Sequence, residues 1–134
     1  MVNNSYLISV KLIKCEAINV TNKRSPLSFS ILGHPIKWSS QVRYLGVIFD
    51  SHLKWSTQCR HMASKATRVL NLLRHSLFGC HSAVKSLAYK SIVRPHSEYA
   101  STVWNPHTSS DIVLIETVQN RAACWICATW NPIT

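Results

Sequence analysis

The sequence predicts an α+β fold in which a small antiparallel β-sheet with a hairpin is followed by three helices. In the first part of the chain apolar and polar residues alternate, as they do in half-buried strands. After Trp55 apolar residues instead recur every three or four positions, as they do along one face of a helix. The composition changes near residue 52, which divides the 134 residues into a strand-rich part, 1–52, and a helix-rich part, 53–134.

The first strands are expected between residues 5 and 38. Residues 5–21 alternate, with a break near Lys14-Cys15-Glu16, and therefore predict one or two strands. Residues 27–32 alternate again, Gly33-His34-Pro35 turns the chain, and residues 36–38 return it, which is typical of a hairpin.

Residues 42–50 predict one further strand, which leads directly into the helical part. They are mostly β-branched, aromatic or otherwise apolar, and Asp50 stands at their end. An isolated acid at this position is more typical of a turn or a helix cap than of a catalytic centre.

The helix after Trp55 has the clearest pattern in the chain. Ser56 or Thr57 is the expected N-cap, and Gly79 suits the left-handed residue that ends a helix. On a helical wheel Arg68, His61 and His75 lie opposite the apolar face, with Arg60 and Lys65 beside them. The apolar face consists of Met62, Ala66, Val69, Leu70, Leu73 and Leu77.

Two more helices complete the prediction. The second begins after Ser82 and is expected to kink or break at Pro95, because proline removes a backbone hydrogen bond. Its predicted inner face is Val84, Leu87, Ala88, Ile92, Tyr99 and Val103. The third follows Ser109 or Ser110, with Asp111 favourably placed against the helix dipole. Its predicted inner face is Ile112, Ile115, Val118, Gln119, Ala122 and Ile126.

The charge of the chain is strongly unbalanced. The net charge is +10 and the isoelectric point is about 9.8, although only 15% of the residues are charged. Between Ser51 and Ser97 there are eight Lys or Arg and five His but no Asp or Glu. This pattern favours a polyanionic partner, nucleic acid before membrane. The alternative is that the acidic counterparts lie elsewhere in a longer protein.

The cysteines do not form the regular framework of a secreted protein. Five cysteines at irregular spacing favour reduced thiols inside a cell, in the nucleus or the cytoplasm. The Cys124-x-x-Cys127 pair has the spacing of half a zinc site, but it falls within the third predicted helix and no matched second pair follows, so a helix position is favoured and no metal site is assigned. No apolar run approaches the roughly 20 residues of a membrane span, and no signal peptide is evident.

Several motifs, taken in order, resemble the C-terminal part of the reverse transcriptase of non-LTR, LINE-type retrotransposons, of the jockey or CR1-like sort. They extend over nearly the whole chain, from about Lys14 to Trp130. The motifs are Tyr44-Leu45-Gly46-Val47 within residues 42–50, Leu53-Lys54-Trp55, Arg94-Pro95, Glu98-Tyr99-Ala100-Ser101, Val103-Trp104-Asn105-Pro106-His107, and Glu116 with Gln119 and Ala122.

The resemblance implies roles for particular residues. Residues 1–52 would be the end of the palm, and residues 53–134 the helical thumb and the segment that follows it. Lys14 would lie near the incoming nucleotide and assist catalysis, and Tyr44, Leu45 and Gly46 would form the primer-grip hairpin. The basic residues Arg60, Lys65, Arg68 and Arg74 on the first long helix would contact nucleic-acid backbone phosphates, consistent with the charge pattern described above.

The chain departs from this family in its catalytic centre. The family's paired aspartates are absent, and the family enzyme would need Mg²⁺ held by such residues. We therefore expect a part of a reverse transcriptase that contacts an RNA/DNA primer–template, lacks polymerase activity alone, and depends on the fingers and palm of the full enzyme. The alternatives are a non-catalytic basic nucleic-acid-binding module and a decayed remnant without function.

Overall fold

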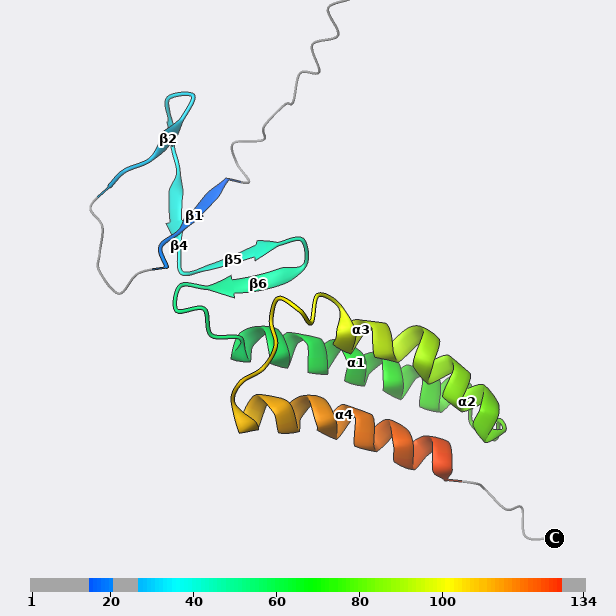
Figure 1. Ribbon diagram of the computed structural model, residues 1–134. Helices are drawn as coiled ribbons and strands as arrows, with labels where there is room; N and C mark the ends of the chain where they lie inside the picture. The colour runs from blue at the N-terminus through cyan, green and yellow to red at the C-terminus, as the bar shows by residue number, and fades with distance from the viewer. Residues whose placement is uncertain (1–14, 21–26, 129–134) are drawn as a thin grey trace, which may run out of the picture.

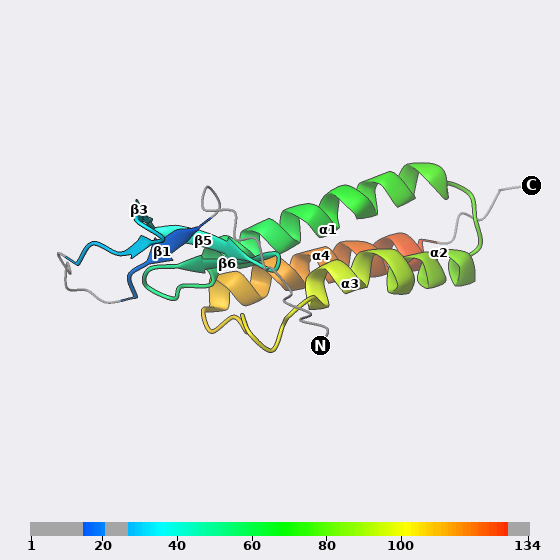
Figure 2. The ribbon, with the colours of Figure 1, turned by 90° about the horizontal axis from the view of Figure 1, so that it is seen from above.

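A computed structural model describes residues 15–20 and 27–128 (Figure 1). Short strands lie at one end of the molecule and a helical bundle extends from them (Figure 2). The predicted α+β fold class is confirmed. The strands of the described residues are β1 (Glu16–Ile18), β2 (Ser30–Ile31), β3 (His34–Pro35), β4 (Lys37–Ser39), β5 (Gln41–Tyr44) and β6 (Val47–Asp50).

The strands form three two-stranded pairs. β2 and β3 pair antiparallel, so a hairpin is present, but its turn is at Leu32-Gly33 and its returning strand is His34-Pro35. The expected returning strand over residues 36–38 is wrong, because Lys37 and Trp38 belong to β4. β5 and β6 are also antiparallel, whereas β1 pairs with β4 in parallel. Of the strands expected over residues 5–21, β1 lies within the described part, and residues 5–14 lie outside it.

The prediction of one strand over residues 42–50, made from the residue pattern, is wrong, because these residues form the β5–β6 hairpin; a hairpin at Tyr44–Gly46 is what the family resemblance implied. Leu45 and Gly46 make its two-residue turn, with φ of +47° and +84°. Two consecutive left-handed residues are what a tight hairpin of this type requires. The residue pattern does not show this turn, because Leu rarely adopts the left-handed conformation and the sequence lacks the usual Asn-Gly or Asp-Gly signal.

The helices pack as a bundle. α1 (Ser56–Ser76) and α4 (Ser109–Cys127) lie side by side and run in the same direction (Figures 1 and 2). Between them in the sequence, a continuous helical segment runs in the opposite direction. It consists of α2 (Ser82–Ala88), the π-helical turn η2 (Tyr89–Val93) and α3 (Arg94–Glu98).

The apolar face of α1 is placed as predicted. Met62, Ala66 and Leu70 are buried, and Val69, Leu73 and Leu77 pack against them half-buried. Gly79 has φ of +80°, which confirms the left-handed residue after the helix. The expected Ser56 or Thr57 N-cap is wrong, because Trp55 occupies the N-cap position and makes no side-chain cap bond. The Ser56 hydroxyl instead donates a hydrogen bond of 2.7 Å to Asp111 of α4.

The inner face predicted for the second helix is wrong. Val84, Leu87, Ile92, Tyr99 and Val103 are all exposed. The buried residues are Lys85, Val93, Ser97 and Trp104. The charged Lys85 lies on the inner face, where a hydrophobic pattern does not place it. The π-helical turn η2 then moves the residues after it to a different side of the helix than a period of 3.6 predicts.

The expected irregularity near Pro95 is present as a π-helical turn. The backbone N–H of Arg94 donates to the carbonyl of Tyr89, five residues earlier. The widened turn lets Pro95 occupy the first turn of α3, where its missing N–H leaves no intrahelical bond unmade.

The prediction of the inner face of α4 is confirmed in the centre of the helix and wrong at two positions. Val118 and Ala122 are buried and Ile115 and Ile126 half-buried, but Ile112 and Gln119 are exposed. Asp111 and Trp125 complete the observed inner face instead, giving Asp111, Ile115, Val118, Ala122 and Trp125 at helical spacing.

Two buried clusters hold the fold together. The larger lies within the bundle and contains Ala63, Ala66, Leu70, Val93, Val118, Ala122 and Trp125. The smaller joins β6 to the bundle and contains Val47, Cys59, Met62 and Trp104. Gln58 reinforces this junction, because its side-chain oxygen accepts a 2.9 Å hydrogen bond from the Ile48 N–H.

The thiol of Cys59 gives the smaller cluster a dependence on pH. Burial, and secondarily the nearby Asp111 carboxylate, raise the pKa of Cys59 from 9.0 to about 11. Between those values the unfolded chain loses the thiol proton and the folded chain keeps it, so the free energy of unfolding should fall as the pH rises from about 9 to about 11. Urea titrations across this range should show a flatter decline for Cys59→Ala than for the wild type. An identical decline in both proteins would contradict the assignment.

Candidate nucleic-acid interface

The basic residues predicted on α1 are all exposed. Arg60, Lys65, Arg68 and Arg74 lie on the part of the helix surface that is turned away from the buried residues. Arg60, Arg68 and Arg74 lie on the side of α1 that borders α4, and Lys65 lies outside the groove between the two helices.

That groove, which we call the α1–α4 groove, consists of adjoining hollows of about 320 Å³ and 420 Å³. Arg60 and Arg68 line the smaller one and Arg74 the larger one, while Arg121 and Thr117 line both. The sequence reasoning missed Arg121, because it lies beyond the acid-free stretch and reaches the other arginines only through helix packing.

The arginines of the groove have no acidic partners among the described residues. The ion pairs in this part of the chain join Arg94 to Glu98 and His52 to Asp50. Arg60 donates through Nε to the Ser56 carbonyl, and no Asp or Glu lines the groove. Unpaired guanidinium groups concentrated in one groove produce a positive potential that suits phosphate.

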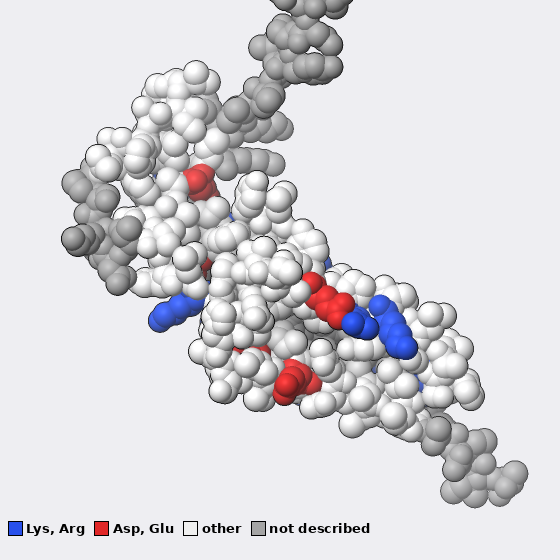
Figure 3. All heavy atoms as spheres, in the orientation of Figure 1, with Lys and Arg blue, Asp and Glu red and all other residues white. Residues whose placement is uncertain are grey.

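The molecule does not carry this charge on every side. The face drawn in Figure 3 shows few Lys and Arg, and over α3 basic and acidic side chains lie next to each other. Arg94 and Glu98 form an ion pair on α3, with the arginine Nε and the glutamate Oε1 2.5 Å apart, and the pair raises the pKa of Arg94 through this hydrogen bond and its charge. Paired charges of this kind add little to the attraction of a polyanion.

The β5–β6 turn is the second predicted site. The side chains of Tyr44 and Leu45 are 64% and 72% exposed. The hydroxyl of Tyr99 donates a 2.8 Å hydrogen bond to the Leu45 carbonyl, and a Cβ atom added at Gly46 would lie 3.4 Å from the Tyr99 ring. The turn is thus fixed against the end of α3, with two large side chains free to meet a ligand.

The remaining predicted site residue, Lys14, lies outside the described residues. The structure therefore brings Arg60, Arg68 and Arg74 together with Arg121 in one groove and presents Tyr44, Leu45 and Gly46 at one turn.

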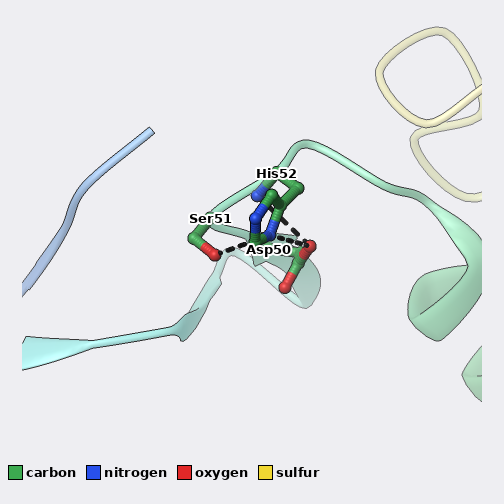
Figure 4. A network of polar contacts seen from close by, with 3 residues as sticks. All are labelled: Asp50, Ser51 and His52. Carbon is green, nitrogen blue, oxygen red and sulfur yellow. Dashed lines mark hydrogen bonds and ion pairs between the residues drawn. The ribbon is translucent and has the colours of Figure 1, made fainter. Parts of the chain in front are cut away.

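Asp50 is the last residue of β6, and its side chain caps the turn at Ser51-His52 that follows, in the structural role expected from the sequence. Its carboxylate accepts a hydrogen bond from the His52 N–H and lies 3.7 Å from His52 Nδ1, which in turn is 3.1 Å from the Ser51 hydroxyl (Figure 4). These contacts hold the turn between β6 and α1, and both contacts of Asp50 are made by its Oδ2 atom.

The residues present do not fit the Mg²⁺ of a polymerase. All five acidic residues of the chain lie in the described part, yet no group of three or more His, Cys, Asp or Glu there is placed to hold a metal ion. Asp111 is buried and accepts from Ser56 and Thr108, and Glu98 pairs with Arg94. Cys124 and Cys127 lie within α4, as predicted, and both are exposed.

None of the helices in the described residues combines the length and the apolar character that crossing a membrane would require.

Comparison with known proteins gives one informative similarity. The chain is 30% identical over 105 residues to the retrovirus-related Pol polyprotein from type-1 retrotransposable element R1 4 of Nasonia vitripennis. The match covers 70% of this chain and 26% of that protein, so the chain spans about a quarter of the relative's length. No protein-family model matches, and no solved structure does. The similarity supports an origin of this chain in a non-LTR retrotransposon.

Proposed function

We propose that this chain is part of a retrotransposon reverse transcriptase, comprising the end of the palm and the thumb, and that it holds nucleic acid for a catalytic centre located elsewhere. The observation that carries the proposal is the α1–α4 groove, where four arginines from two helices meet without any acidic residue. The similarity to a Pol polyprotein is in accord with this assignment.

Within this proposal the groove and the β5–β6 turn have different tasks. Arg60, Arg68, Arg74 and Arg121 bind phosphates of the primer–template backbone, and Lys65 adds to the attraction from outside the groove. The turn holds the end of the growing strand. Its position is defined by the Tyr99 hydrogen bond and by the left-handed Leu45 and Gly46.

The catalytic step itself is assigned to residues outside this chain. A two-metal polymerase needs paired carboxylates. No two of the five acids here are adjacent in the sequence, and no group of three or more His, Cys, Asp or Glu among the described residues is placed to hold a metal ion. We propose that the chain alone is inactive, that Lys14 assists catalysis only in the full enzyme, and that the fingers and palm of that enzyme supply the Mg²⁺ site. The proposed setting is inside the cell, in the nucleus or the cytoplasm, where the nucleic acid is.

The strand layer offers a surface for those missing parts. Phe29 and Trp38 form a tilted aromatic pair with ring centres 5.6 Å apart, yet the two residues are 49% and 40% exposed. Two-stranded pairs of this size are barely stable alone and gain from additional strands or a covering layer. We propose that the remaining palm covers this aromatic pair.

A titration against salt tests the proposed nucleic-acid contact. Primer–template duplex should bind the purified chain with a logarithmic salt slope of about −3 to −4, because each neutralised phosphate contributes about −0.9. Fluorescence anisotropy between about 50 and about 200 mM salt measures this slope. A peptide-nucleic-acid duplex of the same sequence, which has no backbone charge, is the matched control and should not bind. Equal affinity across the salt range would contradict the proposal.

A further inference from the structure

A larger hollow continues the α1–α4 groove at the end of the bundle away from the strands. It has a volume of about 670 Å³ and lies among the ends of α1 and α4 and the start of α2. Arg74, Trp125 and Ala128 line both this hollow and the adjoining part of the groove, so the two form one continuous depression. We call this larger hollow the distal pocket.

The distal pocket contains a lysine that lacks an acidic partner among the described residues. The Lys85 side chain reaches into the wall of the pocket, and the residue is only 7% exposed. Among the described residues its ammonium makes no ion pair or hydrogen bond, and its partner is the Trp125 ring, with Nζ 5.8 Å from the ring centre. The Nζ atom is not among the buried polar atoms that lack a partner, so the ammonium faces the solvent of the pocket, where the cation–π contact contributes about 2 kcal/mol or less. An anion bound in the pocket would supply the missing counter-charge.

The other lining residues indicate the chemistry of that anion. Arg74 and His75 place further basic groups at the pocket, and none of its described lining residues is acidic. The Phe78 ring, 74% exposed, adds an aromatic surface at the same site. Basic groups beside an aromatic face are the combination that binds a phosphate together with its base.

The size of the pocket selects unpaired nucleotides over a duplex. Its volume lies within the range of small-molecule sites, about 300–1,000 Å³, so an unpaired nucleotide can enter it, whereas a duplex can only lay its backbone over this pocket or over the smaller hollows of the groove. A base can also stack on a protein ring only when it has left the stack of its own helix. The pocket therefore suits the unpaired end of a strand, while the paired part of the same nucleic acid lies along the adjoining groove.

We propose that the distal pocket binds a single-stranded segment of nucleic acid, with a phosphate at Lys85 and Arg74 and its base against Phe78. This inference rests on the proposed nucleic-acid contact and adds a second, strand-selective site to it. A primer–template with a single-stranded overhang would then be held at two places, through its duplex along the groove and through its unpaired end in the pocket.

Binding of a labelled single strand and of a fully paired duplex of equal length tests the inference. Lys85→Met keeps the side-chain length and removes the charge, and should weaken single-strand binding about tenfold while changing duplex binding less than about twofold. Phe78→Ala should weaken single-strand binding about fivefold or more, again sparing the duplex. Lys90→Met, which removes the same charge from an exposed position of η2, is the matched control and should change neither.

The outcomes separate this inference from the function on which it rests. If Lys85→Met and Phe78→Ala leave single-strand binding unchanged, or weaken both ligands equally, the distal site is refuted and the groove proposal stands. If the wild-type chain binds duplex but no single strand, only the distal site fails, whereas both proposals fail if it binds neither. If the thermal melt of Lys85→Met differs from that of the wild type, the Phe78→Ala variant alone tests the inference. Phe78 lies at the surface, so its replacement should not disturb the fold.

Discussion

Replacing Arg68 and Arg121 together by glutamate is expected to weaken the binding of primer–template duplex by about 100-fold. The two residues lie on different helices, α1 and α4, and line the same hollow of the α1–α4 groove. Each substitution removes one attraction to phosphate and adds one repulsion, and each such term is worth about 1 kcal/mol near a solvated surface. Four terms of this size, reduced by salt, correspond to a loss of at least two orders of magnitude.

The matched control for this variant changes the net charge by the same amount elsewhere. Lys54 precedes α1 and Lys90 lies in η2, and both are exposed and outside the groove. Lys54→Glu with Lys90→Glu should weaken binding only several-fold, through the loss of long-range attraction. Anisotropy titrations at one salt concentration compare the three proteins. Equal losses in both double variants would mean that net charge, and not the groove, determines binding.

Trp104→Ala is expected to lower the free energy of unfolding by about 3–5 kcal/mol. The Trp104 side chain is 2% exposed and packs with Val47, Cys59 and Met62 in the cluster that joins β6 to the bundle. Its indole N–H also donates a 2.7 Å hydrogen bond to the Tyr99 carbonyl. A loss of this size is a large part of the stability of a small domain, about 5–15 kcal/mol.

Urea denaturation monitored by circular dichroism measures that loss, with a second tryptophan as the control. Trp38 is 40% exposed and packs against Phe29 at the outer strands. Trp38→Ala should therefore cost only about 1 kcal/mol. Similar losses at the two positions would show that the Trp104 cluster does not join the strands to the helices in the way described.

The sequence predicted best where one periodic pattern ran without interruption. The buried Gln58, Cys59 and Ala63 were not among the residues predicted for the apolar face of α1, but those predicted all pack inward, because the 21 residues of the helix contain neither a proline nor a buried charge. The second helix failed for both of these reasons. Lys85 occupies the inner face, where a pattern based on hydrophobicity does not place a charge, and the π-helical turn before Pro95 adds a residue that a period of 3.6 does not count.

The candidate sites were predictable only in part, for a similar reason. Arg60, Arg68 and Arg74 follow from the pattern of one helix, and their exposure agrees with it. Arg121 lies on another element, so its place in the groove depends on how α1 packs on α4. The β5–β6 turn followed from the family resemblance and not from the residue pattern, because its left-handed positions are occupied by Leu45-Gly46. The hydrogen bond that holds it comes from Tyr99, 54 residues away.

That hydrogen bond also has a mechanical consequence. It ties the tip of the hairpin to the helical segment α2–η2–α3, which extends toward the far end of the bundle (Figure 1). Because the helical segment is stiff, a tilt at its α2 end also moves its α3 end, where the Tyr99 hydrogen bond is made. Any tilt of this segment would therefore move the backbone of Leu45 with it. The alignment of the β5–β6 turn is in this way coupled to displacements at the opposite end of the bundle.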